Sequence, residues 1–234
     1  MIIPKPEKTF RMLFQNIQGL PIAPHSHKHQ QICTAIKDTE ADIFGMAELN
    51  LNFKMLGPTS QWTERFQRLQ RNHSVHSYNK HDSSQKRTLF GGTAQIATGI
   101  LSHRAIQSGA DRTGMGRWVW TLFAGKNGVK IRVVSGYRPN PDATDRTGSV
   151  YSQQERRLRI LQDNRNPRRA FVKDLEVQLD SWITEGNLLL IGIDANDNIR
   201  TGDVNAMIRS RGLTNVHAAH QRNAPVIKTH KESR

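Results

Sequence analysis

The chain has 234 residues, a length that suits one large domain or two small ones, and we favour one. Its formal net charge is +14, which favours a polyanionic partner such as nucleic acid, with a generally basic soluble surface as the alternative. The single cysteine, Cys33, excludes a disulfide within the chain and a zinc site built from several thiolates.

Targeting and membrane signals are missing from the sequence. No apolar run approaches the roughly 18 residues that a membrane-spanning helix needs, and Met1 to Lys8 lack the apolar core of a signal peptide. We therefore expect no membrane partner and an intracellular location, with the nucleus as one candidate compartment. Residues 1–9 are interpreted as an N-terminal extension and residues 10–234 as one domain. The sequence carries no signal for an oligomeric state.

Strands outnumber helices among the predicted elements. Period-two alternation predicts strands, whereas apolar residues three and four positions apart predict helices. In chain order these patterns predict a strand over 10–16, a helix over 30–37, and strands over 42–48, 91–101, 117–123 and 129–137. A helix with an apolar stripe from Phe171 to Ile183 follows, then an apolar strand over 187–193 of the kind buried on both faces, and a last helix capped by Asp203. This pattern predicts sheets with helices packed outside them.

Several polar segments have a structural interpretation. Residues 81–87 and 139–149 are predicted surface loops. For the basic cluster Arg165 to Arg169, which divides the helical region in two, a solvated turn is favoured over a dedicated phosphate site. The run containing His25, His27 and His29 is interpreted as a solvated loop that enters the first helix, with metal capture or weak phosphate contact as alternatives.

Several of the predicted strands end in a polar residue of a type that can bind metal or phosphate. These residues are Asn16, Glu48, the segment Tyr137-Arg138-Pro139-Asn140, and the segment Asp194-Ala195-Asn196. Polar groups at the ends of rigid strands are well placed to converge at one edge of a sheet. Taken singly, each is explained by a strand ending where polarity begins, but their identities together favour a shared site.

The chemistry of these residues suits a metal and a phosphate. Magnesium prefers oxygen ligands and often takes only one or two protein carboxylates, so Glu48 is the candidate ligand for Mg²⁺ or Mn²⁺. Asp194 could orient or deprotonate a water molecule. Asn16, Asn196 and Tyr137 could hold ligand or phosphate oxygens, and Arg138 and Asn140 are candidate phosphate-binding residues.

The same segments, taken in order, resemble the motifs of the endonuclease/exonuclease/phosphatase (DNase-I-like) superfamily. Asn16-Ile17-Gln18-Gly19-Leu20 is similar to its N-x-x-G-L motif, and Asp42 to Glu48 is similar to the segment that delivers its metal-binding glutamate. Gly91 to Ser102 resembles its glycine-led strand, Val134 to Asn140 its tyrosine motif, and Leu190 to Asn196 its G-D-x-N motif with one extra residue, Ile193.

The resemblance implies a fold and a set of roles. The fold is a four-layer α/β sandwich of two mostly antiparallel sheets flanked by helices. Asn16 and Glu48 would lie at the metal, Tyr137 would contact the scissile phosphate, Asp194 would align the attacking water, and Asn196 would help to hold the phosphate. The implied activity is metal-dependent hydrolysis of phosphodiester bonds in nucleic acid, with DNA favoured over RNA. In overall style the sequence resembles retroelement-type endonuclease domains more than dedicated repair enzymes.

Two departures from the family pattern qualify this expectation. Gln18 stands where many relatives that cut DNA have an acidic residue. Thr229 to Arg234 resembles the lead-in to a strand of the family. The aspartate of that strand and the family's final histidine would lie downstream. We therefore expect the last strands to be missing and residues 1–234 alone to have little or no nuclease activity. The alternatives are a truncated or degenerate domain that binds nucleic acid without cutting it, and a phosphatase of a small polyanionic substrate.

Overall fold

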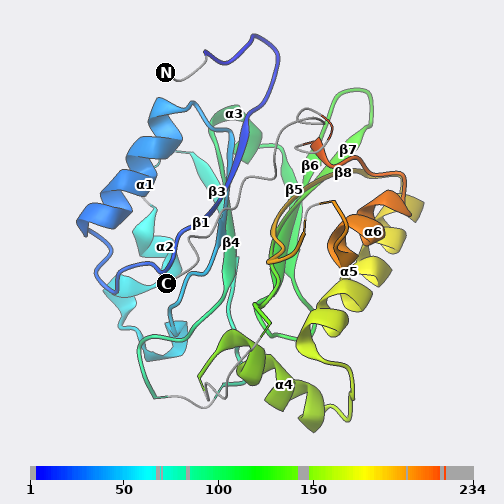
Figure 1. Cartoon of the computed structure of the whole chain (residues 1–234). Coiled ribbons are helices and arrows are strands. Elements are labelled where there is room, and N and C mark those ends of the chain that lie inside the picture. The colour runs from blue at the N-terminus through cyan, green and yellow to red at the C-terminus, as the bar shows by residue number, and fades with distance from the viewer. Residues whose placement is uncertain are drawn as a thin grey trace.

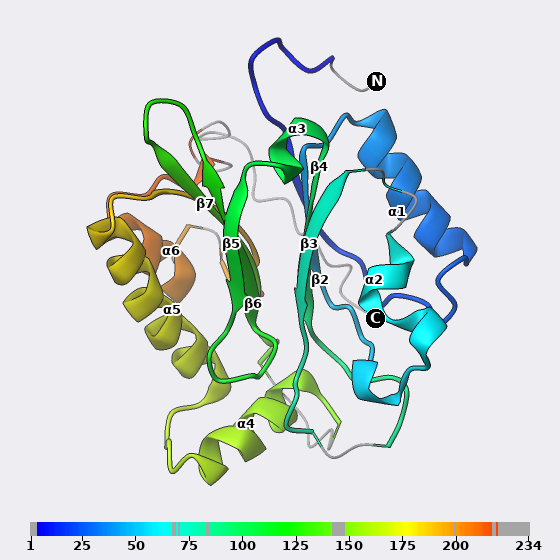
Figure 2. The same ribbon diagram turned by 180° about the vertical axis from the view of Figure 1, so that it is seen from behind.

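Two four-stranded sheets pack face to face, with helices on their outer faces (Figures 1 and 2). The computed structural model describes residues 4–66, 69, 71–82, 85–141, 148–198, 200–216 and 219. The predicted α/β sandwich is confirmed. The stretch from Thr229 to Arg234, interpreted as the lead-in to a further strand, lies outside the described residues, as do His217 and His220. Within the described part of the chain, no helix is both long enough and apolar enough to cross a membrane.

The first half of the described chain forms the first sheet and its outer cover. Its elements are β1 (Met12–Asn16), α1 (His27–Asp38), β2 (Ile43–Ala47), η1 (Phe53–Met55), η2 (Pro58–Ser60), α2 (Trp62–Arg65), β3 (Asn72–Ser77) and β4 (Thr93–Thr98). The strand order is β1-β2-β4-β3; β1 and β2 run parallel and the other pairs are antiparallel. The parallel pair brings the carboxyl ends of β1 and β2 to the same edge.

The second half repeats this arrangement. Its elements are α3 (Gly99–Ser102), β5 (Ala105–Ala110), β6 (Trp118–Ala124), β7 (Lys130–Tyr137), α4 (Val150–Ile160), α5 (Pro167–Thr184), β8 (Leu188–Asp194) and α6 (Asp203–Arg209). The order is β5-β6-β7-β8, and β7 and β8 form the parallel pair. Helices α5 and α6 cover the outer face of this sheet, and α4 lies across one end of the molecule (Figure 1).

Side-chain caps fix where the longer helices begin. Ser26, Ser149 and Asn166 each accept a hydrogen bond from a backbone N–H in the first turn of α1, α4 and α5. Pro167 occupies the first position of α5, where its missing N–H costs nothing. Each cap places the start of its helix at a defined residue, and the first turn of α5 thereby comes to lie beside the loops that follow β7 and β8.

Glycines let the two sheets approach closely near β1 and β8. A Cβ atom at Gly192 would lie 2.9 Å from Met12 Cε and from the Phe14 ring, and one at Gly45 would collide with the Ser135 hydroxyl. Across this interface the side-chain amide of Gln95 donates a hydrogen bond to the Ser135 hydroxyl, with 3.2 Å between Nε2 and Oγ. Any larger residue at Gly45 or Gly192 would push the sheets apart, and with them the strand ends that carry the candidate site.

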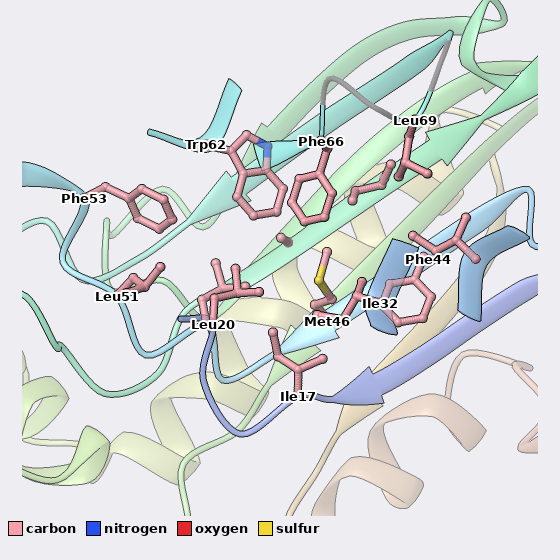
Figure 3. Close-up of a cluster of buried hydrophobic side chains, with 14 of the residues drawn as sticks. Ile17, Leu20, Ile32, Phe44, Met46, Leu51, Phe53, Trp62, Phe66 and Leu69 are labelled. Carbon is pink, nitrogen blue, oxygen red and sulfur yellow. The ribbon is translucent and has the colours of Figure 1, made fainter. Parts of the chain in front are cut away.

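Aromatic rings close the outer side of the first sheet. The buried side chains of Phe53, Trp62 and Phe66 pack with the aliphatic core of that sheet (Figure 3). His76 on β3 stacks on Trp62 with ring centroids 4.9 Å apart and an interplanar angle of 22°. His29 is also buried and lies 4.8 Å from the Phe66 ring, so the expectation that this histidine belongs to a solvated loop is wrong: it lies in the first turn of α1 and faces inward.

Burial makes His76 a source of acid sensitivity. Desolvation, with a smaller contribution from Lys80, lowers the pKa of His76 from 6.5 to about 4. Below pH 6.5 the unfolded chain therefore takes up a proton that the folded protein binds only near pH 4, so stability falls as the pH drops through this window. We expect the protein to lose about 2 kcal/mol of unfolding free energy between about pH 7 and pH 4.5 from this group.

Urea denaturation at the two pH values tests this prediction. His76→Phe keeps an aromatic ring in the stack but cannot titrate, so it should lose most of the pH dependence. His103→Gln, which changes an exposed histidine, should keep the wild-type dependence. An unchanged loss of stability in His76→Phe would contradict the assignment.

Three sequence-based expectations need correction. β3 and β5 carry few apolar residues and were not predicted; backbone pairing with β4 and β6 forms them. The strand predicted over 91–101 ends at Thr98, because Gly99 adopts φ +57° and starts α3. The strand over 187–193 is not buried on both faces: β8 is the edge strand of the described sheet, and Leu188 is 59% exposed.

The two tryptophans of β6 pack against α5. Trp118 is buried and meets Phe171 of α5 edge to face, with ring centroids 5.6 Å apart. Trp120 packs against Trp182, and the Arg132 guanidinium lies over both of these rings. These contacts fix α5 on the outer face of the second sheet.

Candidate active site

Four strand ends from the two sheets meet at one place. In the first sheet Asn16 pairs with Ala47, which immediately precedes Glu48. In the second sheet Tyr137 pairs with Asp194. The structure therefore brings Asn16, Glu48, Tyr137 and Asp194 together, as the positions of these residues at strand ends suggested.

The side chain of Asn16 connects the two sheets. Its amide nitrogen donates to Glu48 Oε1 at 2.9 Å and to Asp194 Oδ2 at 2.7 Å. Both acceptors are carboxylates, so each hydrogen bond is charge-assisted and stronger than a bond between neutral groups. The amide thereby holds two negative groups from different sheets near each other.

The orientation of the Asn16 amide follows from its neighbours. Gln18 N donates to Asn16 Oδ1 at 2.9 Å, so the oxygen faces the backbone and the NH₂ group faces the two carboxylates. A flipped amide would set its single oxygen against both carboxylates and its NH₂ group against the N–H of Gln18. In this arrangement the Asn16 oxygen is directed to Gln18, and the contacts of Asn16 favour a positioning role; its assignment as a metal ligand stays a prediction.

Tyr137 is buried and lies near both carboxylates. Burial, then the charge of Glu48 and its hydrogen bond with the phenol, and then the charge of Asp194 raise the pKa of Tyr137 far above its ordinary value, while a hydrogen bond with the Asn196 side chain acts in the opposite direction. The phenol therefore keeps its proton throughout the neutral range. It can act as a hydrogen-bond donor but not as a general base.

Asn196 and the segment after Tyr137 are fastened to each other. Asn196 Nδ2 donates to the carbonyl oxygen of Arg138 at 2.7 Å, and Arg138 N donates to the carbonyl oxygen of Asp194 at 2.9 Å. The side chain of Arg138 is buried and points to Asp197 and Asp203, with nitrogen–oxygen distances of 2.7 and 2.9 Å. Those ion pairs supply its charge balance, and its predicted phosphate contact stays a prediction.

Asn140 is exposed beyond Pro139, at the outer end of the segment that follows β7. Asp203, predicted to cap the last helix, is its first residue instead, and Gly202 occupies the cap position. The carboxylate of Asp203 is drawn to Arg138. This ion pair fastens α6 to the segment after β7.

Left-handed backbone conformations gather around the site. Gln18, Glu48 and Asn196 have φ values of +48°, +56° and +45°, and Asn50 has +52°. Residues other than glycine rarely adopt this region, and such strain is retained where the surroundings require it, often at functional sites. Asn50 is held by a hydrogen bond from Gly91 N to its Oδ1 at 2.7 Å. These turns aim the side chain of Glu48 toward Asn16 and Tyr137.

The donor set fits a hard divalent cation. Glu48 and Asp194 provide oxygen atoms from two half-buried carboxylates, and magnesium commonly takes one or two protein carboxylates and completes its shell with water and phosphate oxygens. Among the described residues, no group of three or more His, Cys, Asp and Glu side chains could hold a metal ion.

Sequence reasoning missed three residues that support the site, namely Asn50, Asp197 and Arg168. The guanidinium of Arg168 donates to the carbonyl oxygens of Pro139 and Asn196, at 2.7 and 2.9 Å. The interpretation of the basic cluster as a solvated turn is wrong for this residue, because the start of α5 turns Arg168 into the molecule. Arg165 is likewise paired, with Asp163 and Asp174. The signal available in the sequence was the cluster itself, directly before the helical stripe.

Comparison with known proteins finds solved structures that have a similar fold. No protein-family model matches the sequence, and no curated protein matches it. Among solved structures, a 3′ phosphatase from Neisseria bound to a product DNA hairpin is similar, with a TM-score of 0.51 and 14% identity over 81% of this chain and 58% of the other.

Two further structures are a 3′-5′ exonuclease from Neisseria meningitidis and an AP endonuclease from Archaeoglobus fulgidus. Their TM-scores are both 0.49, their identities 16% and 14%, and the matches cover 80% and 81% of this chain and 57% and 58% of theirs. The chain thus spans 58% of the length of the first of these structures. At such identities the likeness shows the fold alone, and this is the DNase-I-like fold.

Proposed function

We propose that the protein hydrolyses phosphodiester bonds of nucleic acid with the help of a divalent metal ion, Mg²⁺ or Mn²⁺. The observation that carries this proposal is the Asn16 amide bridging Glu48 and Asp194, two carboxylates delivered by different sheets. Two carboxylates that share one amide donor repel each other, and a cation bound between them would remove this unfavourable free energy. The net charge of +14 supports a polyanionic substrate.

The proposed roles follow from the contacts. Glu48 would hold the ion, which when bound would polarise the phosphate and stabilise the leaving oxygen. Asp194, oriented by Asn16, would accept a hydrogen bond from the attacking water and align it. Tyr137 keeps its proton because its pKa is raised, so it would donate to a phosphate oxygen. Asn196 fixes the segment after β7 through the Arg138 carbonyl oxygen and would help to hold the phosphate.

DNA is the proposed substrate before RNA, and the retroelement-type endonuclease domains remain the proposed subgroup. The similar 3′ phosphatase was solved with a DNA hairpin, which supports a DNA partner for this fold. The carboxyl ends of β1, β2, β7 and β8 form the side of the molecule to which such a strand would bind.

A plasmid-nicking assay tests the hydrolysis directly. With magnesium we expect residues 1–234 to convert supercoiled plasmid to the open circle only slowly, and EDTA or Glu48→Gln should stop this residual conversion. Nicking that persists in Glu48→Gln would indicate a contaminating nuclease or a different site. Tight binding of the plasmid without any nicking would support the alternative, a nucleic-acid-binding domain that does not cut.

Salt dependence distinguishes nucleic acid from a small polyanion. Each backbone phosphate that the protein neutralises contributes about −0.9 to the slope of log affinity against log salt, so contact with about five phosphates gives a slope near −4.5. Fluorescence anisotropy with a labelled duplex between low and physiological salt measures this slope. A flat response would instead favour a phosphatase of a small phosphorylated substrate.

A further inference from the structure

A pocket of about 650 Å³ lies between α5, α6 and the segment after β7. Its volume is within the range of small-ligand sites. The residues that carry the argument are Tyr151, Asn166, Arg168, Arg169, Lys173 and Ala206. None of them belongs to the set of strand-end residues assigned to hydrolysis.

The pocket carries unmatched positive charge. Lys173 is paired with Glu176 at 2.7 Å, and Arg138, which also lines the pocket, is paired with Asp197 and Asp203. Arg168 donates to two carbonyl oxygens and comes no nearer than 3.9 Å to the Asp197 carboxylate. Arg169 is exposed and forms no ion pair with any carboxylate of the described chain. Two guanidinium groups at one wall favour a phosphate, because their planar N–H groups match its oxygens.

The rest of the lining is suited to a flat apolar group. Val172 of α5 and Met207 of α6 are buried residues of the wall, and the exposed Ala206 and the half-buried Tyr151 line the same pocket. Nucleobases stack on aromatic and apolar side chains with little regard to their identity. The cationic and amide groups suit a phosphate, and the apolar wall suits a base. This lining therefore matches a nucleotide better than a bare anion, which would make no contact with the apolar wall.

The pocket shares residues with the candidate active site. Arg138 lines the pocket and directly follows Tyr137, and Arg168 lines it while its guanidinium donates to the carbonyl oxygen of Asn196. We propose that the pocket binds one nucleotide of the nucleic-acid strand beside the bond at the active site, with its phosphate on Arg168 and Arg169 and its base against Tyr151 and the apolar wall. The choice of ligand rests on the proposed function.

Binding of a short labelled single strand tests the proposal without hydrolysis. Measurements in EDTA by fluorescence anisotropy would compare the wild type with Ala206→Trp and Ser210→Trp, which fill the pocket from exposed positions of the α6 region, and with Arg169→Ala. Each variant should weaken binding about tenfold, as expected for the loss of one stacked base or one charged contact. Arg169→Ala should also reduce the salt slope by about 1, whereas the two tryptophan variants should leave it unchanged.

Lys126→Ala is the matched control for charge. Lys126 is exposed in the turn between β6 and β7, at the opposite end of β7 from Tyr137. Its loss should change affinity less than about twofold, because it lies away from the strand that the pocket would bind. Thermal denaturation of every variant would show that the fold is kept. Equal affinities for wild type, Ala206→Trp and Ser210→Trp would overturn the proposal.

Calorimetric titration with small ligands identifies what the pocket recognises. A nucleoside 5′-monophosphate should bind the wild type and lose binding in Ala206→Trp, whereas inorganic phosphate and the unphosphorylated nucleoside should each bind about tenfold more weakly. Inorganic phosphate binding as tightly as the nucleotide would overturn the assignment of a nucleotide site. If the protein does not nick plasmid but the pocket variants still weaken binding of the strand, the proposed hydrolysis is wrong and the nucleotide pocket is supported. If the protein nicks plasmid and the pocket variants bind the strand like the wild type, the hydrolysis is supported and the nucleotide pocket is wrong.

Discussion

Glu48→Gln is expected to weaken magnesium binding at least about 100-fold, which corresponds to about 2.7 kcal/mol. The substitution keeps the shape of the side chain and an oxygen that can still accept from Asn16 and Tyr137, but it removes the negative charge that a hard cation requires. It also removes repulsion between Glu48 and Asp194. The variant should therefore fold with the stability of the wild type, or slightly more, in the absence of metal.

Isothermal titration with magnesium, together with urea denaturation in EDTA, measures both effects. Glu40→Gln is the matched control, because Glu40 is exposed just before the opposite end of β2. It should bind magnesium like the wild type. Unchanged magnesium affinity in Glu48→Gln would remove this residue from the metal site, and a large loss of stability would show that its charge serves the fold.

The second large effect is expected from Asn16→Asp, which converts the bridge between two carboxylates into a third carboxylate. The variant loses two charge-assisted hydrogen bonds, to Glu48 and to Asp194, and gains repulsion from both. It keeps an oxygen for Gln18 N, so the turn after β1 has no other reason to change. We expect a loss of about 3 kcal/mol of unfolding free energy in EDTA.

Magnesium should restore much of this loss, because three carboxylates around one site attract a divalent cation more strongly than two. Denaturation curves in EDTA and in millimolar magnesium test both statements. Asn127→Asp, which makes the same change in charge at the exposed β6–β7 turn, should be neutral in both solutions. If Asn16→Asp is as stable as the wild type in EDTA, the two carboxylates do not depend on the amide that joins them.

The sequence was sufficient to predict that the polar residues at four strand ends lie close together. Asn16, Glu48, Tyr137 and Asp194 each follow an apolar run, and a strand that ends in a polar residue leaves little freedom for where that residue lies. The pairing of β1 with β2 and of β7 with β8 then fixes which strand ends meet. The alternating and apolar runs predicted sheets with helices outside them, and the resemblance of the motifs to a known family implied the sandwich of two sheets.

The direction of a side chain was beyond sequence reasoning wherever a distant element decides it. For Arg138 that element is α6, which lies some sixty residues further along the chain and supplies Asp203 as a partner for the guanidinium. Arg168 belongs to a cluster that looks solvated until the N-cap at Asn166 sets the first turn of α5 beside Pro139 and Asn196. β3 could not be predicted because hydrogen bonds with β4, not its own polar side chains, make it a strand.

Each sheet is built from one contiguous half of the described chain, and the helix α3 separates the two halves. Asn16 and Glu48 belong to the first half, whereas Tyr137, Asp194 and Asn196 belong to the second. Neither half alone contains both carboxylates, so the site is created only by the docking of one half on the other. Two separately expressed fragments, divided at the exposed residues around His103, would accordingly act as a split reporter whose magnesium affinity records their reassociation.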